Sequence, residues 1–287
     1  MEIRKTFGVS EQEILKSFLA DDTKHQDGEG KSGALMIFSK DSKFVIKTIS
    51  DSEFMFMVDF CQKYSEYLKQ NPNSLLVKIY ACFESDPYNV LLMQNVCSPD
   101  EKGEKGEGSW ERFDLKGSLL GRTVKPKDRT EVTTLKDVDF LELNKKIPLP
   151  VETYNLLLNQ IEQDCNFLSS YEIMDYSLLI GIYYSNSSEI CSEGLITTNT
   201  SSDSQITRSC YFSRLDGCVN PISGKKEVYY LGIIDYLIVY TEKKKIETFF
   251  KTLASETQTI SAINPILYAQ RFNKFMSDNV FLLLTDH

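Results

Sequence analysis

The sequence predicts an α+β protein, folded as one large domain or as two lobes. Its 287 residues, 41% of them hydrophobic, are sufficient to bury a sizeable core. Runs of β-branched and aromatic residues between turn residues predict strands, and segments with apolar residues at helical spacing predict helices. No run approaches the roughly 18 consecutive apolar residues of a membrane-spanning helix.

The charge balance and the cysteines restrict the class of protein. A formal net charge of -9 argues against general nucleic-acid binding, which needs an extended basic surface. The seven cysteines include no CxxC pair and no metal-ligand spacing, and only two histidines are present. The first residues contain no apolar signal segment. We therefore expect a reduced, cytoplasmic protein that meets a membrane only peripherally.

The first hundred residues predict helices that alternate with antiparallel strands. Apolar residues recur at helical spacing in two segments, and shorter apolar runs flank a polar turn. The predicted elements are an amphipathic helix over residues 1–20, strands over 34–38 and 44–49, a helix over 51–70, and strands near 75–83 and 89–93.

A glycine-rich turn over residues 28–33 precedes the first predicted strand of the hairpin. Such a turn lets backbone amides approach a phosphate, although glycine turns also commonly do no more than join strands. Lys47 lies among large apolar residues of the second strand, where an unpaired ammonium is costly, unless it extends outward from an edge strand. Glu53, in the first turn of the next helix, is either the ion-pair partner of Lys47 or an acid favoured by the helix dipole.

The remainder of the chain predicts a second set of elements after a hinge. Residues 94–109 form a polar, glycine-containing loop, and residues 185–208 are rich in Ser, Thr and Asn with few apolar anchors, which predicts a mobile insertion. The predicted elements are a helix over 151–171, a strand over 228–240 and a final helix over 265–276.

Two aspartates interrupt apolar runs and are the strongest candidates for chemistry. Asp175 lies within the run 173–182, and Asp235 lies within the run 231–237. A carboxylate in such surroundings must be paired, bound to a metal or poised for proton transfer. On adjacent strands or strand ends, the two would form a pair that binds a divalent cation and acts as a general base. An isolated aspartate of this kind also commonly caps a turn, so the inference depends on neighbouring motifs.

A basic segment follows the second aspartate. Lys243, Lys244 and Lys245 are consecutive, and four apolar residues follow them within residues 246–253. This combination suits an anionic lipid surface, where each lysine contributes on the order of 1 kcal/mol. It is equally typical of an ordinary solvated helix face.

The order of these motifs resembles that of the phosphatidylinositol phosphate kinases. The resemblance covers about residues 30–276 and includes a glycine loop followed by a strand lysine in the sequence VIKT. The further motifs are DLKGS at 114–118, KDVDF at 136–140, MDYSLL at 174–179, IID at 233–235 and YAQRF at 268–272.

The resemblance implies a two-lobed α+β fold, distantly related to protein kinases, with an antiparallel sheet in the N-terminal lobe. The single kinase domain, residues 1–287, would comprise an N-terminal lobe over 1–97 and a C-terminal lobe over 98–287. The C-terminal lobe would include the mobile insertion 185–209 and an activation loop over 236–262.

The resemblance also implies ATP and Mg²⁺ as cofactors and assigns residues to them. Asp175 would be the catalytic aspartate that orients the lipid hydroxyl, and Asp235 would bind Mg²⁺. Phosphoryl transfer depends mainly on positioning and charge neutralisation, which fits these roles. The residues implied for ATP are Lys47 on the phosphates with support from Glu53, Gly30, Ser32 and Gly33 in the glycine loop, and Asn95 and Val96 at the hinge near adenine.

The implied lipid substrate is a phosphoinositide in the cytosolic leaflet. Within the family, type I enzymes make the 4,5-bisphosphate from phosphatidylinositol 4-phosphate and carry a glutamate in a Lys-x-Glu context of the activation loop, which Glu247 matches. Residues 260–265 instead resemble the type II enzymes, which act on the 5-phosphate, and kinases of the 3-phosphate also carry the glutamate. The cations that would hold the inositol phosphate are Lys31, Lys116, Arg122 and Lys136.

Two other functions remain open. One is a catalytically weak phosphoinositide-binding adaptor on the same fold; the other, a protein kinase, is disfavoured because HRD and DFG motifs are absent. A peripheral membrane association through residues 243–245 is expected, together with Lys125, Lys127 and Lys251. A dimer is possible, but only about 27 residues precede the glycine loop, so the dimerisation elements of the family look shortened.

Overall fold

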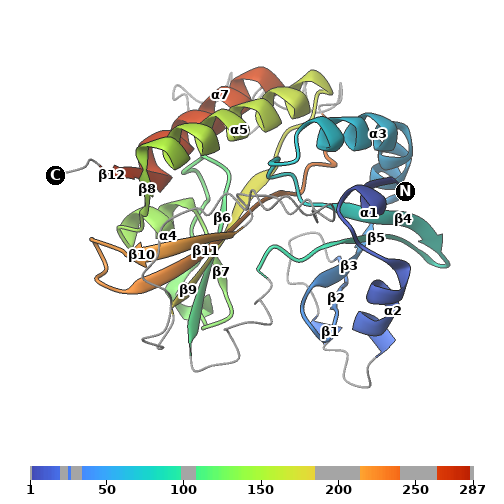
Figure 1. The fold of residues 1–287 in the computed structure, drawn as a ribbon, viewed down its shortest axis with the longest axis horizontal. Helices are drawn as coiled ribbons and strands as arrows, with labels where there is room; N and C mark the ends of the chain where they lie inside the picture. Colours follow the sequence, from blue (N-terminus) through green and yellow to red (C-terminus); the bar gives the residue numbers. More distant parts are fainter. Residues whose placement is uncertain are drawn as a thin grey trace, which may run out of the picture. The chain divides into compact units, whose positions relative to one another are not determined.

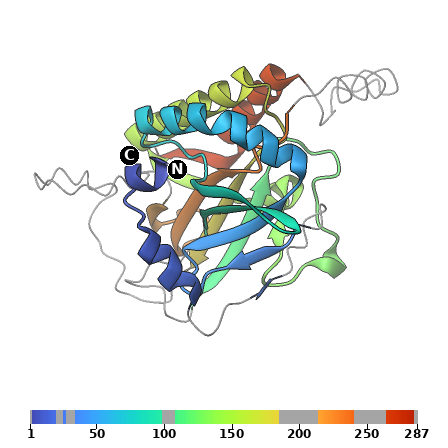
Figure 2. The same ribbon diagram turned by 90° about the vertical axis from the view of Figure 1, so that its right-hand side faces the viewer.

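The computed structural model describes residues 2–19, 25–26, 34–97, 108–184, 214–239 and 264–284. Within these ranges, residues 25–26 and 216–219 are described by their backbone alone. These residues belong to two compact units (Figure 1; Figure 2). The first comprises Met1–Lys105 and Asn199–Tyr211, and the second comprises Gly106–Thr198 and Phe212–His287. Each unit is described by itself below.

The first unit contains a five-stranded, fully antiparallel sheet in the order β1-β2-β3-β5-β4. The predicted hairpin is confirmed, since Met36 pairs with Lys47 across β2 and β3. Asp41 stabilises its turn by accepting hydrogen bonds from the Ser39 hydroxyl at 2.7 Å and the Lys43 amide at 3.1 Å. The strands are β1 (His25–Gln26), β2 (Met36–Phe38), β3 (Phe44–Ile49), β4 (Ile79–Ser85) and β5 (Tyr88–Gln94).

The predicted single helix over residues 1–20 is wrong, because two helices occupy this segment: α1 (Glu2–Thr6) and α2 (Glu11–Leu19). Gly8 adopts a φ of 69° and ends the first helix, as glycine commonly does at a helix C-terminus. Ser10 then caps the second helix, accepting a hydrogen bond from the Glu13 amide at 3.0 Å.

Helix α3 (Asp51–Gln70) has the predicted boundaries. Its N-terminus is a capping box, in which the Glu53 carboxylate accepts from the Ser50 amide at 2.8 Å and the Ser50 hydroxyl accepts from the Glu53 amide. Its buried face includes Tyr64. Val58 also follows the helical spacing but is 50% exposed, because it lies at the margin of that face.

The second unit is built on a sheet in the order β10-β11-β9-β6-β7, antiparallel except for the parallel pair β6–β7. The predicted strand 228–240 begins slightly earlier and ends at Ile234, so Asp235 lies after the strand and not within it. The strands are β6 (Ser109–Leu115), β7 (Thr134–Leu135), β9 (Ser177–Tyr184), β10 (Arg214–Val219) and β11 (Lys226–Ile234).

Two helices, α5 (Val151–Ser170) and α7 (Pro265–Phe275), lie side by side in this unit (Figure 1; Figure 2). Both were predicted to within one residue. Leu156 of α5 is 55% exposed although it follows the helical spacing, whereas Leu157 is fully buried. The remaining elements are η1 (Pro126–Asp128), α4 (Asp137–Glu142), β8 (Ile147–Pro150), η2 (Met276–Val280) and β12 (Phe281–Leu284), with β8 and β12 paired in parallel. Among the helices that the structure describes, none is both long and apolar enough to span a membrane.

Candidate active site

Three charged residues adjoin one edge of the sheet in the second unit. The antiparallel register pairs the last residue of β6, Leu115, with Leu178 of β9, and the last residue of β11, Ile234, with Ser177. The corresponding ends of three neighbouring strands therefore meet at this edge. The residues next to it are Lys116 after β6, Asp175 two residues before β9, and Asp235 directly after β11.

Lys116 and Asp175 form an ion pair. The Lys116 Nζ lies 2.8 Å from Asp175 Oδ1, and the side chains are 19% and 37% exposed. The ammonium therefore neutralises the carboxylate while part of the carboxylate faces solvent. The sequence indicated both residues, but not that they contact each other.

Asp175 and Asp235 share an unusual backbone conformation, with φ values of 66° and 60°. The left-handed region costs an L-residue on the order of 1 kcal/mol and is tolerated best by glycine, asparagine and aspartate. It interrupts the alternation of an extended strand, which explains why both aspartates lie outside the strands to which the apolar runs assigned them. Two strained aspartates at one edge are typical of a functional site.

A buried carboxylate holds the turn that carries Lys116. Asp137 is fully buried, and its Oδ1 accepts hydrogen bonds from the backbone amides of Lys116 at 2.9 Å, Gly117 at 2.8 Å and Ser118 at 3.3 Å. Its Oδ2 accepts from Arg122 Nε at 2.7 Å. Burial raises the pKa of the Asp137 carboxyl, while the Arg122 guanidinium opposes this shift. The turn is thus fixed by the Asp137 carboxylate, whose charge is neutralised by Arg122 and whose two oxygens both accept hydrogen bonds.

Helix α7 contacts both turns of the site. The Tyr268 hydroxyl donates a hydrogen bond to the carbonyl of Tyr176, the residue after Asp175. One helical turn later, Arg271 Nη2 donates a hydrogen bond to the carbonyl of Lys116 at 3.4 Å. Burial, and then the charge of Asp175, raise the pKa of the Tyr268 hydroxyl well above its usual value, so it remains a donor.

Gly117 allows α7 to approach the Lys116 turn closely. Its φ is 67°, and a Cβ at this position would lie 3.1 Å from Phe272 Cα and 3.1 Å from Phe275 Cβ. Glycine is therefore required here for its conformation and for its size.

The other sequence-predicted residues of the second unit have different surroundings. Arg122 is engaged in ion pairs of 2.7 Å with Asp114 and with Asp137, and its side chain is 15% exposed. Lys136 is half-buried and precedes α4 as its N-cap residue. Lys116 therefore contacts Asp175 directly, whereas Arg122 binds Asp137, the carboxylate that holds the Lys116 turn.

In the first unit, Lys47 lies in the interior strand β3, paired with Met36 on one side and Leu91 on the other. Asn95 donates to the Ser42 carbonyl at 2.7 Å, and Val96 is buried. The other predicted features lie outside the described residues. They are the hinge loop from 98 to 107, the insertion 185–209, residues 240–262 of the activation loop, Gly30, Lys31, Ser32, Gly33, Lys243, Lys244, Lys245, Glu247 and Lys251.

Sequence reasoning assigned no role to Asp137, Asp139, Tyr268 or Arg271. Asp139 is fully buried and binds Thr123 and Arg129, at 2.7 and 2.5 Å. In the sequence, Asp137, Asp139, Tyr268 and Arg271 stood out only as members of the KDVDF and YAQRF motifs. The motifs did not indicate which residues they contact.

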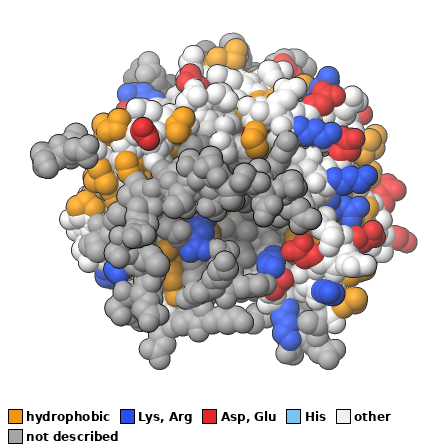
Figure 3. All heavy atoms as spheres, in the orientation of Figure 1, with side chains coloured by type: hydrophobic (Ala, Val, Ile, Leu, Met, Phe, Trp, Pro, Cys, Tyr) orange, Lys and Arg blue, Asp and Glu red, His pale blue; other side chains and the backbone are white. Residues whose placement is uncertain are grey.

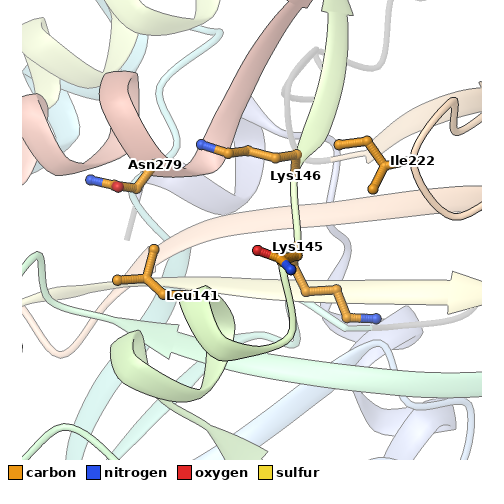
Figure 4. A pocket seen from close by; sticks show the side chains of 6 residues that line it. Leu141, Lys145, Lys146, Ile222 and Asn279 are labelled. Carbon is orange, nitrogen blue, oxygen red and sulfur yellow. The ribbon is translucent and has the colours of Figure 1, made fainter.

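A pocket at the opposite end of the sheet is not part of this site (Figure 4). Its residue Ile222 lies in the turn before β11, whose first residues pair with the far end of β9. The eight residues of β9 separate this end from Asp175 by about 25 Å at a strand rise of about 3.3 Å per residue. The pocket is lined by Leu141, Asn144, Lys145, Lys146, Ile222 and Asn279.

No cluster of three metal-ligating side chains occurs within the part of the chain that the structure describes. The two aspartates nevertheless suit a hard cation, because Mg²⁺ is usually held by one or two carboxylates together with substrate phosphates and water.

The chain matches a family of known proteins over most of its length. The profile of the family described as phosphatidylinositol-4-phosphate 5-kinase matches residues 18–279. A probable phosphatidylinositol phosphate kinase of Dictyostelium discoideum is 32% identical over 86% of the chain and 41% of its own length. Human phosphatidylinositol 4-phosphate 5-kinase type-1 beta is 31% identical over 97% of the chain and 56% of its own length.

A phosphatidylinositol 4-phosphate 5-kinase of Plasmodium falciparum is 32% identical over 88% of the chain. The chain spans 15% of that relative and about half the length of the human one. The matched segment includes every residue of the edge formed by Lys116, Asp175 and Asp235. The chain belongs to the phosphatidylinositol-4-phosphate 5-kinase family.

Proposed function

We propose that this protein is a lipid kinase that transfers the γ-phosphate of ATP to the 5-hydroxyl of phosphatidylinositol 4-phosphate. The observation that carries the proposal is the ion pair of Lys116 and Asp175 at the strand edge shared with Asp235. The names of the relatives, and the Lys245-Ile246-Glu247 sequence, support the 4-phosphate as the substrate.

In this mechanism Asp175 contacts the acceptor. Its carboxylate accepts a hydrogen bond from the inositol hydroxyl and takes the proton as the oxygen attacks the γ-phosphorus, while the bond from that phosphorus to ADP breaks. General-base assistance of this kind contributes about 10²- to 10⁴-fold to a rate. Asp175 adopts a left-handed backbone conformation and precedes β9, so it lies outside the apolar strand.

Lys116 acts on the charge of the site. Its ammonium, 2.8 Å from Asp175, orients the carboxylate and adds positive charge close to the transferred phosphoryl group. Positioned charge of this kind is the main source of catalysis in phosphoryl transfer. Asp137 and Arg271 hold the backbone of Lys116, so its position does not depend on the substrate.

The cofactor roles follow from residue type. Asp235 would hold Mg²⁺, which neutralises phosphate charge when it is bound. Lys47, in the interior strand β3, would bind the ATP phosphates, with Glu53 in support and with the glycine loop around Gly30, Ser32 and Gly33. We also propose that the two units are the two lobes of a kinase-like fold and that Asn95 and Val96 border the adenine.

The proposal also includes the setting of the reaction. The acceptor lipid lies in the cytosolic leaflet, so the protein would associate peripherally with a membrane through Lys243, Lys244 and Lys245. Lys31, Lys136 and Glu247 would contact the head group.

The test is an assay with radiolabelled ATP and Mg²⁺ on vesicles that contain, separately, the 3-, 4- and 5-monophosphates of phosphatidylinositol. Preferential conversion of the 4-phosphate to the 4,5-bisphosphate is expected. A preference for another isomer would retain the kinase and replace the substrate. Absence of turnover on all three, with phosphoinositide binding retained, would favour the adaptor.

A further inference from the structure

Two consecutive leucines are exposed close to the candidate active site. Leu119 and Leu120 are 50% and 61% exposed, and they lie three and four residues after Lys116. The turn that presents them is closed by the Arg122 amide, which donates to the Leu119 carbonyl at 3.3 Å, and by Gly121 at a φ of 67°. The leucines therefore form the tip of a tight turn.

This turn is fixed at both ends. Before the leucines, Asp137 binds the amides of Gly117 and Ser118; after them, it binds the Arg122 side chain. Because these contacts are buried and charged, the turn cannot fold inward to cover the leucines. Exposure of apolar surface on a rigid support, without a covering element among the described residues, is typical of an interaction site.

The position of the turn identifies the partner. Under the proposed function, Asp175 must reach an inositol ring in the head-group layer of a bilayer. Four residues of chain span at most about 14 Å, so the leucines lie within that reach of Lys116 and hence of the acceptor. One head-group layer is only about 5–8 Å thick, so a turn within about 14 Å of the acceptor is close enough for its tip to reach the level where acyl chains begin.

The charges of the same loop agree with an anionic surface. The next exposed charges after the leucines are Lys125 and Lys127, and neither makes an ion pair with any residue that the structure describes. The exposed acids that follow are Asp128, directly after Lys127, and Glu131. On the face shown in Figure 3, the described acidic and basic side chains are interspersed.

We infer that Leu119 and Leu120 form an interfacial anchor that enters an anionic lipid bilayer beside the acceptor site, with Lys125 and Lys127 at the head groups. This inference rests on the proposed function, which supplies the reason for a bilayer at this edge.

The first experiment measures flotation of the full chain with vesicles of phosphatidylcholine and phosphatidylserine that contain no phosphoinositide. The variant Leu119→Ser/Leu120→Ser should bind about tenfold more weakly, from the apolar area that two half-exposed leucines can bury. The matched control is Met55→Ser/Val58→Ser, since Met55 and Val58 on α3 are 59% and 50% exposed. Equal losses in the two variants, or no loss in the first, would overturn the anchor.

A second variant tests insertion into the bilayer directly, by fluorescence, and does not rely on a loss of vesicle binding. Leu120→Trp adds a tryptophan to a chain that has only Trp110, and its emission should be quenched by lipids brominated in the acyl chains. Met55→Trp is the control, and brominated lipids should quench its emission no more than they quench the emission of Trp110 in the unchanged chain. Absence of additional quenching at position 120 would contradict the anchor.

Activity separates this inference from the proposed function. If the anchor and the proposed function are both right, turnover by Leu119→Ser/Leu120→Ser should fall on vesicles and on short-chain soluble lipid to different extents. The fold-reduction on vesicles should be at least about five times the fold-reduction on the soluble lipid. An equal loss on both substrates would overturn the anchor. Absence of turnover in the unchanged chain would overturn the proposed function, whereas the flotation and quenching results would still decide the anchor.

Discussion

The hydroxyl of Tyr268 donates a hydrogen bond to the backbone carbonyl of Tyr176, and this bond links helix α7 to the turn that contains Asp175. The two rings also pack edge to face, with centroids 4.8 Å apart. The left-handed conformation of Asp175 is therefore supported from the helix, which is how local strain persists in a folded protein.

Removal of this hydroxyl should affect catalysis more than folding. We expect Tyr268→Phe to keep the ring packing, to cost about 1 kcal/mol of unfolding free energy and to lower kcat several-fold with little change in KM for ATP. Steady-state kinetics and urea unfolding measure both effects. Tyr88→Phe, at a 57% exposed position of β5, is the control and should change neither. A fall in stability without a fall in kcat would show that the bond has only a structural role.

The two glycines of the leucine turn provide a test of close packing. Gly117 and Gly121 both have a φ of 67°, but a Cβ at 121 would meet nothing within 4 Å, whereas a Cβ at 117 would meet α7 at 3.1 Å. Alanine in the left-handed region costs about 1–2 kcal/mol at either position. Gly117→Ala should therefore destabilise the protein by about 1 kcal/mol more than Gly121→Ala, because it must also displace the helix.

Urea unfolding of the two variants measures this difference. Equal losses of stability would show that α7 does not pack against the glycine as closely as described, and that only the backbone conformation selects glycine there.

Asp41 should make the stability of the first unit depend on pH in the acid range. Burial alone raises its pKa, but hydrogen bonds from the Ser39 and Ser17 hydroxyls outweigh this effect and lower the pKa below its usual value. A lowered pKa means that the stabilisation is present above about pH 4 and is lost as the pH falls through the lower, folded-state pKa.

We therefore expect Asp41→Asn to be less stable than the unchanged chain at pH 7, with a difference that shrinks toward pH 3. Urea midpoints at pH 7, 5 and 3 measure it. A difference that stays constant with pH would exclude a role for the ionised carboxylate.

Periodicity was sufficient to predict the long helices. The boundaries of α3, α5 and α7 were predicted to within one residue, because each has a continuous apolar face with a capping or proline signal nearby. The prediction of one helix over residues 1–20 was wrong, because Gly8 at a φ of 69° separates two helices although the apolar spacing continues across it.

The site was predictable in its parts but not in its connections. Apolar runs located Asp175 and Asp235, although hydrophobicity could not show that each lies just outside its strand with positive φ. The hydrogen bonds of Asp137 to the Lys116 turn connect residues about 20 positions apart, and no local sequence pattern encodes such a contact. The resemblance of the DLKGS and YAQRF motifs to a known family indicated importance, and only the three-dimensional structure showed that they meet.

Phosphate transfer by the variant Asp175→Asn tests whether this carboxylate is the catalytic base. Asparagine tolerates the left-handed backbone and has nearly the same shape as aspartate, so the fold should be retained. It cannot take the proton of the acceptor, and turnover of phosphatidylinositol 4-phosphate vesicles with ATP and Mg²⁺ should fall by at least about 100-fold. Circular dichroism and urea unfolding check the fold. A folded variant with turnover close to that of the unchanged chain would contradict the assignment of Asp175 as the catalytic residue.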